Sequence, residues 1–221
     1  TDLFLHYDIS TGVWTQLANL PKPVRLAAIA CYEGKIYAAG GFRSTQIRSF
    51  YIYDIATDAW MRGPNLPDDV MGASLGAWRG KLYLVGGSRD YFWNPVSRVD
   101  VYDIASGKWT AGGGQEMPAA VFMPFKVQVG PYIYVVGGMS NVEPYNVDLT
   151  QRYDMRKNKW EIGPAFTSAR AGGSLAATSS HLYALGGDLD GGWAMDTTDL
   201  VEVLDLSTWP EGAWEDAGVS L

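Results

Sequence analysis

A Gly-Gly pair at the end of a short apolar run recurs four times along the chain, and this repeat limits the possible fold more than any other feature. The pairs stand at 40–41, 86–87, 137–138 and 186–187, so successive pairs are 46, 51 and 49 residues apart. Each pair ends a short apolar run, and the runs read KIYAAGG, KLYLVGG, YIYVVGG and HLYALGG. A period of this length indicates a repeat protein, in which each repeat is one small unit packed against its neighbours.

A second motif keeps step with the glycines: a Tyr-Asp pair followed by a Trp seven residues after the Tyr. Its four copies are Tyr7-Asp8 with Trp14, Tyr53-Asp54 with Trp60, Tyr102-Asp103 with Trp109, and Tyr153-Asp154 with Trp160. A fifth, degenerate copy reads Leu204-Asp205 with Trp214, and three extra residues around Trp209-Pro210 stretch its spacing to ten. The constant spacing predicts that each copy forms the same local structure.

The segment between the Asp and the Trp is typical of a hairpin turn. Two residues before each Trp stands a type that tolerates the left-handed backbone conformation of short hairpin loops. These residues are Gly12, Asp58, Gly107, Asn158 and, in the fifth copy, Gly212. Strands are predicted for the alternating segment before the turn, for the apolar run before Gly-Gly and for a further segment ahead of that run. Together with the strand that carries the Trp after the turn, each repeat contains four antiparallel strands, about one propeller blade.

Together these motifs resemble the kelch repeat, which also has a proline turn before the first strand. The prolines are Pro21, Pro67 and Pro118, whereas the fourth repeat has Phe166-Thr167 in that place. The resemblance covers essentially the whole chain and implies an all-β fold, a kelch-type β-propeller with blades around a central channel. WD-type repeats have a similar period, but their Trp-Asp dipeptide is missing at the repeat position.

Counting strands gives four complete four-stranded blades plus an N-terminal half blade, all in a single propeller domain, 1–221. We expect the half blade at 1–20 and the blades at about 21–66, 67–117, 118–166 and 167–221. The inner strand pair of the half blade is missing. The chain could be a fragment of a larger propeller, could borrow strands from a partner or by self-association, or could close around an incomplete blade. Because exposed inner edges favour aggregation, we favour the fragment.

Composition excludes several classes of protein. The net charge is −7 and the 17 Lys and Arg residues are scattered, so nucleic acid is not an expected partner. No apolar run is long enough to span a membrane, and the N-terminus has no signal-peptide pattern. Cys31 is the single cysteine, and His6 and His181 are the two histidines, so neither a disulfide nor a zinc site is expected. A low lysine content tilts the expected location slightly towards secretion or the cell surface.

Aromatic residues in the variable loops after the Gly-Gly pairs are one set of candidate ligand-binding residues. The second loop presents Tyr91, Phe92 and Trp93 in a row beside Arg89, and Trp193 stands in the fourth loop. Such a cluster could stack on a sugar or anchor a protein partner. It could equally cover the rim of a neighbouring blade.

Arginines form the second set. Arg25 and Arg170 precede the first strand of a blade, and Arg43 and Arg48 lie in the first variable loop. Converging guanidinium groups can bind carboxylates, and the resemblance implies this use because kelch adaptors capture acidic peptides with loop arginines. The alternative is that these arginines are solvated or form ion pairs between blades. Tyr145, in the third variable loop, completes the candidate ligand-binding residues.

The fourth loop also carries Asp188 and Asp190, spaced as at the start of a calcium loop. The remaining ligands of that pattern are absent, so the metal is only a weak candidate and a solvated acidic loop is the alternative. No cofactor is expected. The chain has no G-x-S-x-G, H-E-x-x-H or P-loop motif, so an enzyme is the less favoured interpretation.

The sequence therefore predicts a non-catalytic binding module that presents variable loops on one propeller face to a protein or peptide partner. The alternative is a carbohydrate-binding or sugar-epimerising propeller of the sialic-acid mutarotase kind. Such an enzyme would need only an acid/base pair and an arginine in the channel.

Overall fold

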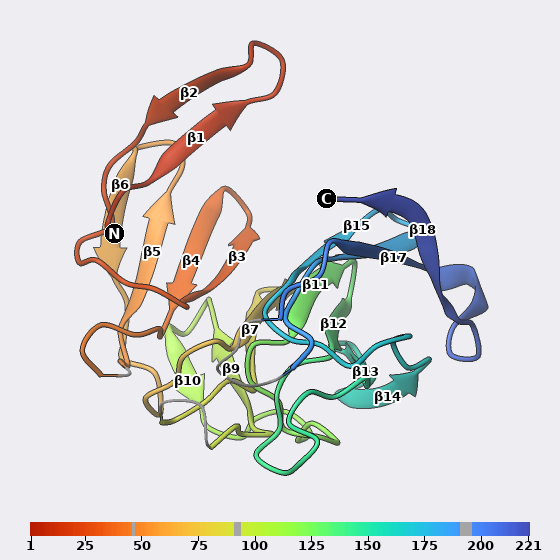
Figure 1. Ribbon diagram of the computed structural model, residues 1–221. Coiled ribbons are helices and arrows are strands. Elements are labelled where there is room, and N and C mark those ends of the chain that lie inside the picture. Colours follow the sequence, from red (N-terminus) through yellow and green to blue (C-terminus); the bar gives the residue numbers. More distant parts are fainter. Residues whose placement is uncertain (46, 91–93, 191–195) are drawn as a thin grey trace.

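The computed structural model of the protein describes residues 1–45, 47–90, 94–190 and 196–221. These residues form short antiparallel strands and a single 3-10 helix, Leu206–Thr208. Figure 1 shows the strands grouped into small sheets that stand side by side along an arc, as the blades of a propeller do.

The described strands form one two-stranded sheet and four sheets of four strands each. We call the four larger sheets the first to fourth blades, in chain order. The two-stranded sheet is a hairpin of β1 (Leu5–Asp8) and β2 (Val13–Gln16). The first blade contains β3 (Ala28–Tyr32), β4 (Lys35–Ala39), β5 (Phe50–Asp54) and β6 (Ala59–Arg62), and the second contains β7 (Ser74–Trp78), β8 (Lys81–Val85), β9 (Val99–Asp103) and β10 (Lys108–Thr110). The third blade contains β11 (Phe125–Val129), β12 (Tyr132–Val136), β13 (Thr150–Asp154) and β14 (Lys159–Gly163), and the fourth contains β15 (Ser174–Ala177), β16 (His181–Leu185), β17 (Leu200–Asp205) and β18 (Trp214–Ser220). Neighbours in each sheet are neighbours in the sequence. The prediction of an all-β propeller with four complete blades and an N-terminal half blade is confirmed.

The hydrophobic core lies between blades and not within them. One buried cluster joins the first and second blades around Phe50 and Leu82, a second joins the second and third around Val99 and Ile133, and a third joins the third and fourth. Because a four-stranded sheet cannot bury its faces alone, each blade depends on its neighbours for stability.

The repeated Tyr and Trp connect each blade to the segment that precedes it. In the first blade, Tyr53 Oη donates to Asp58 Oδ1 at 2.6 Å, and the same oxygen accepts the amide of Ala18 at 2.8 Å. Trp60 Nε1 donates to the carbonyl of Ala18 at 2.8 Å. Asp58, two residues before Trp60, thus joins the turn and Tyr53 to the preceding segment at Ala18.

The third blade repeats this arrangement with an amide in place of the carboxylate. Tyr153 Oη donates to Asn158 Oδ1, which also accepts the amide of Gln115, and Trp160 Nε1 donates to the Gln115 carbonyl. We call this three-part contact the Tyr–Asx–Trp clamp. The second blade has Gly107 at the Asx position, and there Trp109 Nε1 is buried without a hydrogen-bond partner among the described residues.

The predicted left-handed turn residues are confirmed in four copies and wrong in the fifth. Gly12, Asp58, Gly107 and Asn158 have φ between 48° and 69°. Gly212 does not have a positive φ, and it lies in a longer connection that contains the 3-10 helix capped by Asp205.

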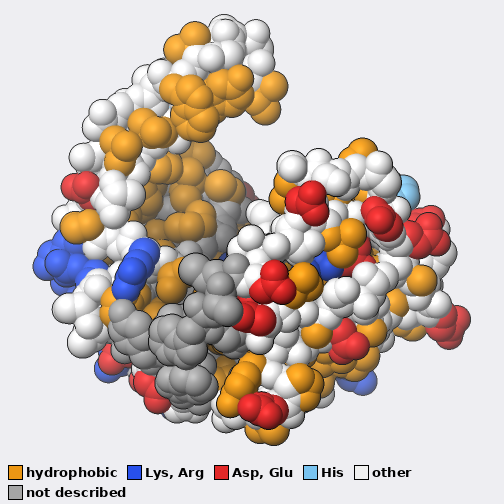
Figure 2. All heavy atoms as spheres, in the orientation of Figure 1, with side chains coloured by type: hydrophobic (Ala, Val, Ile, Leu, Met, Phe, Trp, Pro, Cys, Tyr) orange, Lys and Arg blue, Asp and Glu red, His pale blue; other side chains and the backbone are white. Residues whose placement is uncertain are grey.

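The arc is open between the β1–β2 hairpin and the fourth blade, as Figures 1 and 2 show. The hairpin displays exposed apolar side chains, which include Trp14 at 64% and Val13 at 54% exposure, and Figure 2 shows this apolar surface beside the opening. Among the described residues, no helix has the length and apolar character needed to cross a membrane.

Candidate functional site

Three connecting segments meet at one edge of the first blade and line an open pocket of about 250 Å³. They are the connection from β2 to β3, the loop from β4 to β5 and the connection from β6 to β7. The described residues that line the pocket are mostly polar: Lys22, Val24, Arg43, Ile47, Arg48, Ser49, Tyr51, Arg62, Asn65 and Asp69. We call it the cationic pocket, because it has four cationic side chains and, among its described residues, one carboxylate.

Gly41 brings two of these segments into contact. Its φ is 107°, and a Cβ at this position would lie 2.5 Å from Val24 Cγ2 and 2.8 Å from the Arg25 carbonyl. Only glycine allows the backbones to approach this closely. Beyond it, Phe42 and Arg25 exchange both backbone hydrogen bonds, at 2.8 and 3.1 Å, which fixes Arg43 beside the connection that carries Lys22.

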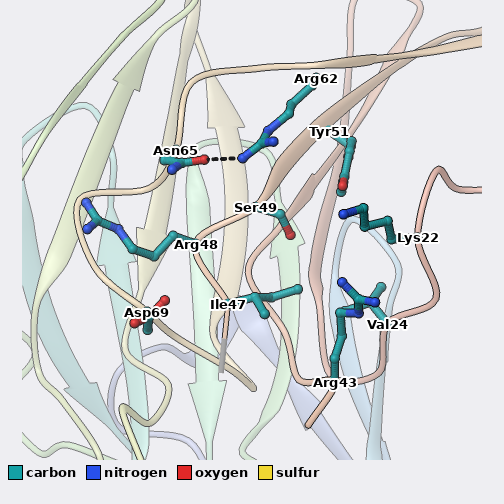
Figure 3. A pocket seen from close by; sticks show the side chains of 10 residues that line it. All are labelled: Lys22, Val24, Arg43, Ile47, Arg48, Ser49, Tyr51, Arg62, Asn65 and Asp69. Carbon is teal, nitrogen blue, oxygen red and sulfur yellow. Dashed lines mark hydrogen bonds between the residues drawn. The ribbon is translucent and has the colours of Figure 1, made fainter. Parts of the chain in front are cut away.

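Two of the four cations are held by neighbouring groups. Arg48 donates from Nε to the Leu66 carbonyl and from Nη2 to the Pro67 carbonyl, both at 2.8 Å. Arg62 donates from Nη2 to Asn65 Oδ1 at 2.8 Å, the contact drawn as a dashed line in Figure 3. Neither arginine has a carboxylate partner among the described residues, so no internal anion offsets either charge at the pocket.

The other two cations, Lys22 and Arg43, form no ion pair with any described residue. Figure 3 shows their side chains on the same side of the pocket, near the hydroxyls of Ser49 and Tyr51. Tyr51 is buried and lies opposite Arg62 in the β5–β6 ladder. Figure 2 shows Lys and Arg side chains gathered over this blade, whereas acidic side chains are spread over the opposite half of the view.

The second blade shows what these positions do when the chain supplies its own anions. The bridge Met71↔Ser88 corresponds to Arg25↔Phe42, so Arg89 stands where Arg43 does and Asp68 stands where Lys22 does. There Arg89 pairs with Asp68 at 2.9 Å, and Asp68 also lies 3.5 Å from Arg98.

The same correspondence extends along β9. Arg98 pairs with Asp100 at 2.8 Å, and the matching residues of the first blade are Ser49 and Tyr51. The first blade therefore has Arg43 in the place of Arg89 and Lys22 in the place of Asp68, and the other arginine and the other acid are replaced by neutral side chains. A cluster of like charges without internal counter-ions can bind an external carboxylate or another anion.

The fourth blade fills its corresponding space with a buried ion pair. Arg170 is fully buried, and its guanidinium pairs with the fully buried carboxylate of Glu202 and donates from Nε to the Gly186 carbonyl at 2.9 Å. Arg170 was a candidate ligand-binding residue, but this pairing occupies its guanidinium inside the protein. In the third blade Gln151 stands where Glu202 stands in the fourth, and its side chain bonds both backbone groups of Ala119.

The other candidate residues lie in separate places. Arg25 is exposed, and its guanidinium carbon lies 4.6 Å from the ring centre of Phe42, the residue that precedes Arg43. Arg89 forms the ion pair with Asp68 described above. Tyr145 and Asp190 line one open pocket in common, at the edge of the third and fourth blades. Candidates Tyr91, Phe92, Trp93 and Trp193 lie outside the described residues.

Asp188 and Asp190 form a local turn. The carboxylate of Asp188 accepts the amide of Asp190 at 3.0 Å, and the Asp188 carbonyl accepts from Asn146. No group of three or more His, Cys, Asp or Glu side chains with metal-binding geometry occurs among the described residues. The calcium hypothesis therefore gains no further ligand from the part of the chain that the structure describes.

Sequence reasoning missed Lys22, Ser49, Tyr51 and Arg62 as parts of a site. Each is ordinary in its own segment, and the pocket appears only when three connections are brought together by the Gly41 contact. One signal was present in the sequence: when the repeats are aligned on their Gly-Gly pairs, Lys22 stands where the next repeat has Asp68.

Comparisons with known proteins agree with this architecture. A family model described as "Kelch motif" matches residues 23–67, 71–113 and 126–167. The chain is 26% identical over 194 residues to "Kelch domain-containing protein 8B" of Mus musculus, a match that covers 85% of this chain and 42% of the relative. It is 31% identical over 120 residues to "Kelch-like protein 21" of Danio rerio, covering 54% of this chain and 18% of that protein.

Among solved structures, the one titled "Structure of YjhT" superposes with a TM-score of 0.79 at 18% identity. The superposition covers 93% of this chain and 74% of the other. The chain thus spans less than half the length of the two curated relatives named above.

Proposed function

Because the chain belongs to the kelch-repeat family, we propose that it is a non-catalytic binding module whose cationic pocket takes an acidic segment of a protein or peptide partner. Kelch propellers are typically protein-interaction modules, and their variable loops are the natural binding surface of a rigid scaffold.

One observation carries the proposal. Arg43 and Lys22 form no ion pair among the described residues, whereas the matching pair in the second blade, Arg89 and Asp68, is an internal ion pair. Arg48 and Arg62 add two further charges, and the hydrogen bonds that they form with described residues go to neutral groups. The pocket is open and lies at the blade edge, which suits an extended peptide with several carboxylates better than a single enclosed ion.

The test is fluorescence anisotropy with a short labelled peptide in which Glu alternates with Gly, and with its Gln counterpart. The protein is expected to bind the Glu peptide only, and binding should weaken as salt rises from about 50 to about 300 mM, because the charges are solvent-exposed and screened. The double variant Lys22→Gln/Arg43→Gln should bind at least about tenfold more weakly, which is about 1.4 kcal/mol.

The control is Lys108→Gln/Lys159→Gln, which removes the same charge from exposed positions on β10 and β14. If both double variants lose affinity equally, binding follows net charge and the pocket proposal is wrong. A sialylated sugar added as competitor tests the carbohydrate alternative: displacement of the peptide by the sugar, but not by a neutral sugar, would favour a sugar-acid ligand over a peptide.

A further inference from the structure

A second pocket lies at the inner strands of the first three blades, separate from the cationic pocket. Its volume is about 430 Å³, within the range of small-molecule sites, and β3, β7 and β11 form its walls. Most of the lining is apolar, from Ile29, Leu75, Val127 and Ile133. In Figure 1 these three strands stand around the centre of the arc, so the pocket belongs to the central channel, and we call it the channel pocket.

The free edge of β7 runs through this pocket. In the β7–β8 register, the backbone groups of alternate residues 73, 75 and 77 point away from β8. Side chains of β11 reach two of them: Lys126 Nζ donates to the Ala73 carbonyl at 2.6 Å, and Gln128 bonds both backbone groups of Ala77 at 2.8 Å. Between them, no side chain among the described residues bonds the backbone of Leu75, which lines the pocket.

Lys126 brings a positive charge to this edge without a matching negative one. It lines the pocket, and among the described residues no carboxylate pairs with its ammonium. Burial lowers the pKa of this amine to about 8, so at neutral pH most molecules still carry the charge. A partly buried cation without a counter-ion is costly, and a ligand anion would offset that cost.

Ser74 supplies an unused hydroxyl at the same place. Its side chain is 3% exposed, it lines the pocket, and its Oγ has no hydrogen-bond partner among the described residues. The carbonyl that holds Lys126 belongs to Ala73, so the ammonium is bound at the residue next to Ser74 in the chain. Buried hydroxyls are almost always hydrogen-bonded, so an unpartnered one on a pocket-lining residue indicates a missing partner.

We propose that the channel pocket binds a small organic monocarboxylate with a compact apolar body, its carboxylate held by Lys126 and Ser74 and its body by Ile29, Leu75, Val127 and Ile133. The lining offers a cation and a hydroxyl from Lys126 and Ser74, and apart from Cys31 and Gln128 the remaining residues are apolar. An inorganic anion would leave the apolar walls uncovered, and a neutral apolar ligand would leave the ammonium unpaired.

Cys31 makes the site directly measurable. It is the single cysteine of the chain, it is exposed, and it lines the channel pocket. The probes are benzoate, its neutral counterpart benzamide and inorganic phosphate, and the readout is the rate at which N-ethylmaleimide modifies Cys31, followed by mass spectrometry. Benzoate is expected to slow the modification in a saturable way, whereas benzamide and phosphate should not.

Two conservative variants assign the effect. Lys126→Met keeps the length of the side chain and should weaken benzoate protection at least about tenfold, and Ser74→Ala should weaken it several-fold. The control Lys81→Met removes an exposed lysine from β8 and should leave protection unchanged. Equal protection by benzamide, or undiminished protection in a folded Lys126→Met variant, would overturn the proposal. Lys22→Gln/Arg43→Gln should keep full protection, which separates this site from the peptide-binding one.

Discussion

At the scale of single residues, Arg170 and Glu202 form an ion pair that is closed off from solvent. Both side chains have zero exposure, and Glu202 Oε1 also accepts the amide of Thr167 at 3.1 Å. The Arg170 guanidinium carbon lies 4.4 Å from the ring centre of Phe166. The pair therefore joins the connection before the fourth blade to β17.

Replacing one partner should be more harmful than replacing both. Glu202→Gln leaves a buried guanidinium without its counter-ion, and we expect a loss of about 3 to 5 kcal/mol in the free energy of unfolding. Arg170→Met/Glu202→Leu removes both charges and should recover most of that loss. Urea denaturation of the two variants measures the difference, and a Glu202→Gln variant as stable as the double variant would contradict the expectation.

Asp154 gives the chain a defined response to acid. Its side chain is almost fully buried, Arg156 Nη2 lies 2.8 Å from Oδ2, and the amides of Arg156 and Lys157 bond Oδ1. The hydrogen bond from Arg156 is the main reason that the pKa of Asp154 falls from 3.8 to about 2. A carboxyl with a lowered folded-state pKa stabilises the fold above its unfolded pKa and loses this contribution as the pH falls through the folded value.

Asp154→Asn should therefore cost about 1 to 2 kcal/mol in the free energy of unfolding at pH 7, and the cost should vanish between about pH 4 and about pH 2. Chemical denaturation at a series of pH values checks this. Asp103→Asn is the matched control, because Asp103 has the same position in the second blade but no arginine partner among the described residues. A deficit for Asp154→Asn that persists at pH 2 would show that the carboxylate charge is not its cause.

At the scale of elements, the Tyr-to-Trp spacing is constant because the Tyr and the Trp lie opposite each other across the same turn in all four hairpins. Tyr153 and Trp160 face each other in the β13–β14 ladder, with ring centres 5.1 Å apart, and Asn158 adds the clamp by accepting from the tyrosine and from the Gln115 amide. The strands and turns of four repeats could be predicted because each turn needs its residue type locally. The fifth copy could not, because Gly212 belongs to a longer connection whose 3-10 helix is set by Asp205.

The clamp should be measurable in the third blade. Asn158→Gly keeps the left-handed conformation, as Gly107 does naturally, and removes only the side chain, so we expect a loss of about 1 to 2 kcal/mol in the free energy of unfolding. Asn158→Ala should lose more, because alanine is also strained at a φ of 54°. Asn158→Asp reproduces the first blade and should be close to wild type. If Asn158→Gly is as stable as wild type by urea denaturation, the clamp does not stabilise the blade.

The candidate site shows the limit of prediction from sequence at the same scale. Arg43 could be singled out because it stands in a variable loop after a Gly-Gly pair. Its neighbours in the pocket could not, because Lys22 lies in another connection and Arg62 on an outer strand opposite Tyr51. Pairing across connections depends on which residues the blade edge brings together, and no local pattern encodes it.

At the scale of the whole molecule, stability is shared between neighbouring blades, so an end unit with one neighbour should be the least stable. The β1–β2 hairpin is such a unit. Its strand residues are exposed apart from the half-buried Asp8, whereas most of β12 is buried. It is held to the first blade by the Tyr–Asx–Trp clamp, which binds Ala18, and by Phe4, whose ring meets Tyr53 and Trp60 edge-on at 4.9 and 5.4 Å.

Native-state hydrogen exchange should therefore resolve the hairpin from the blades. We expect the amides of β1 and β2 to exchange at least about 100-fold faster than those of β12 and β13, because a hairpin with one packed edge opens without unfolding the rest. Phe4→Ala removes the ring that packs on Tyr53 and Trp60, so it should speed exchange in the hairpin further and leave β12 and β13 unchanged. Exchange of the hairpin and the third blade at one common rate would instead mean that the arc unfolds as a single cooperative unit, and that the exposed hairpin is stabilised by contacts beyond those to the first blade.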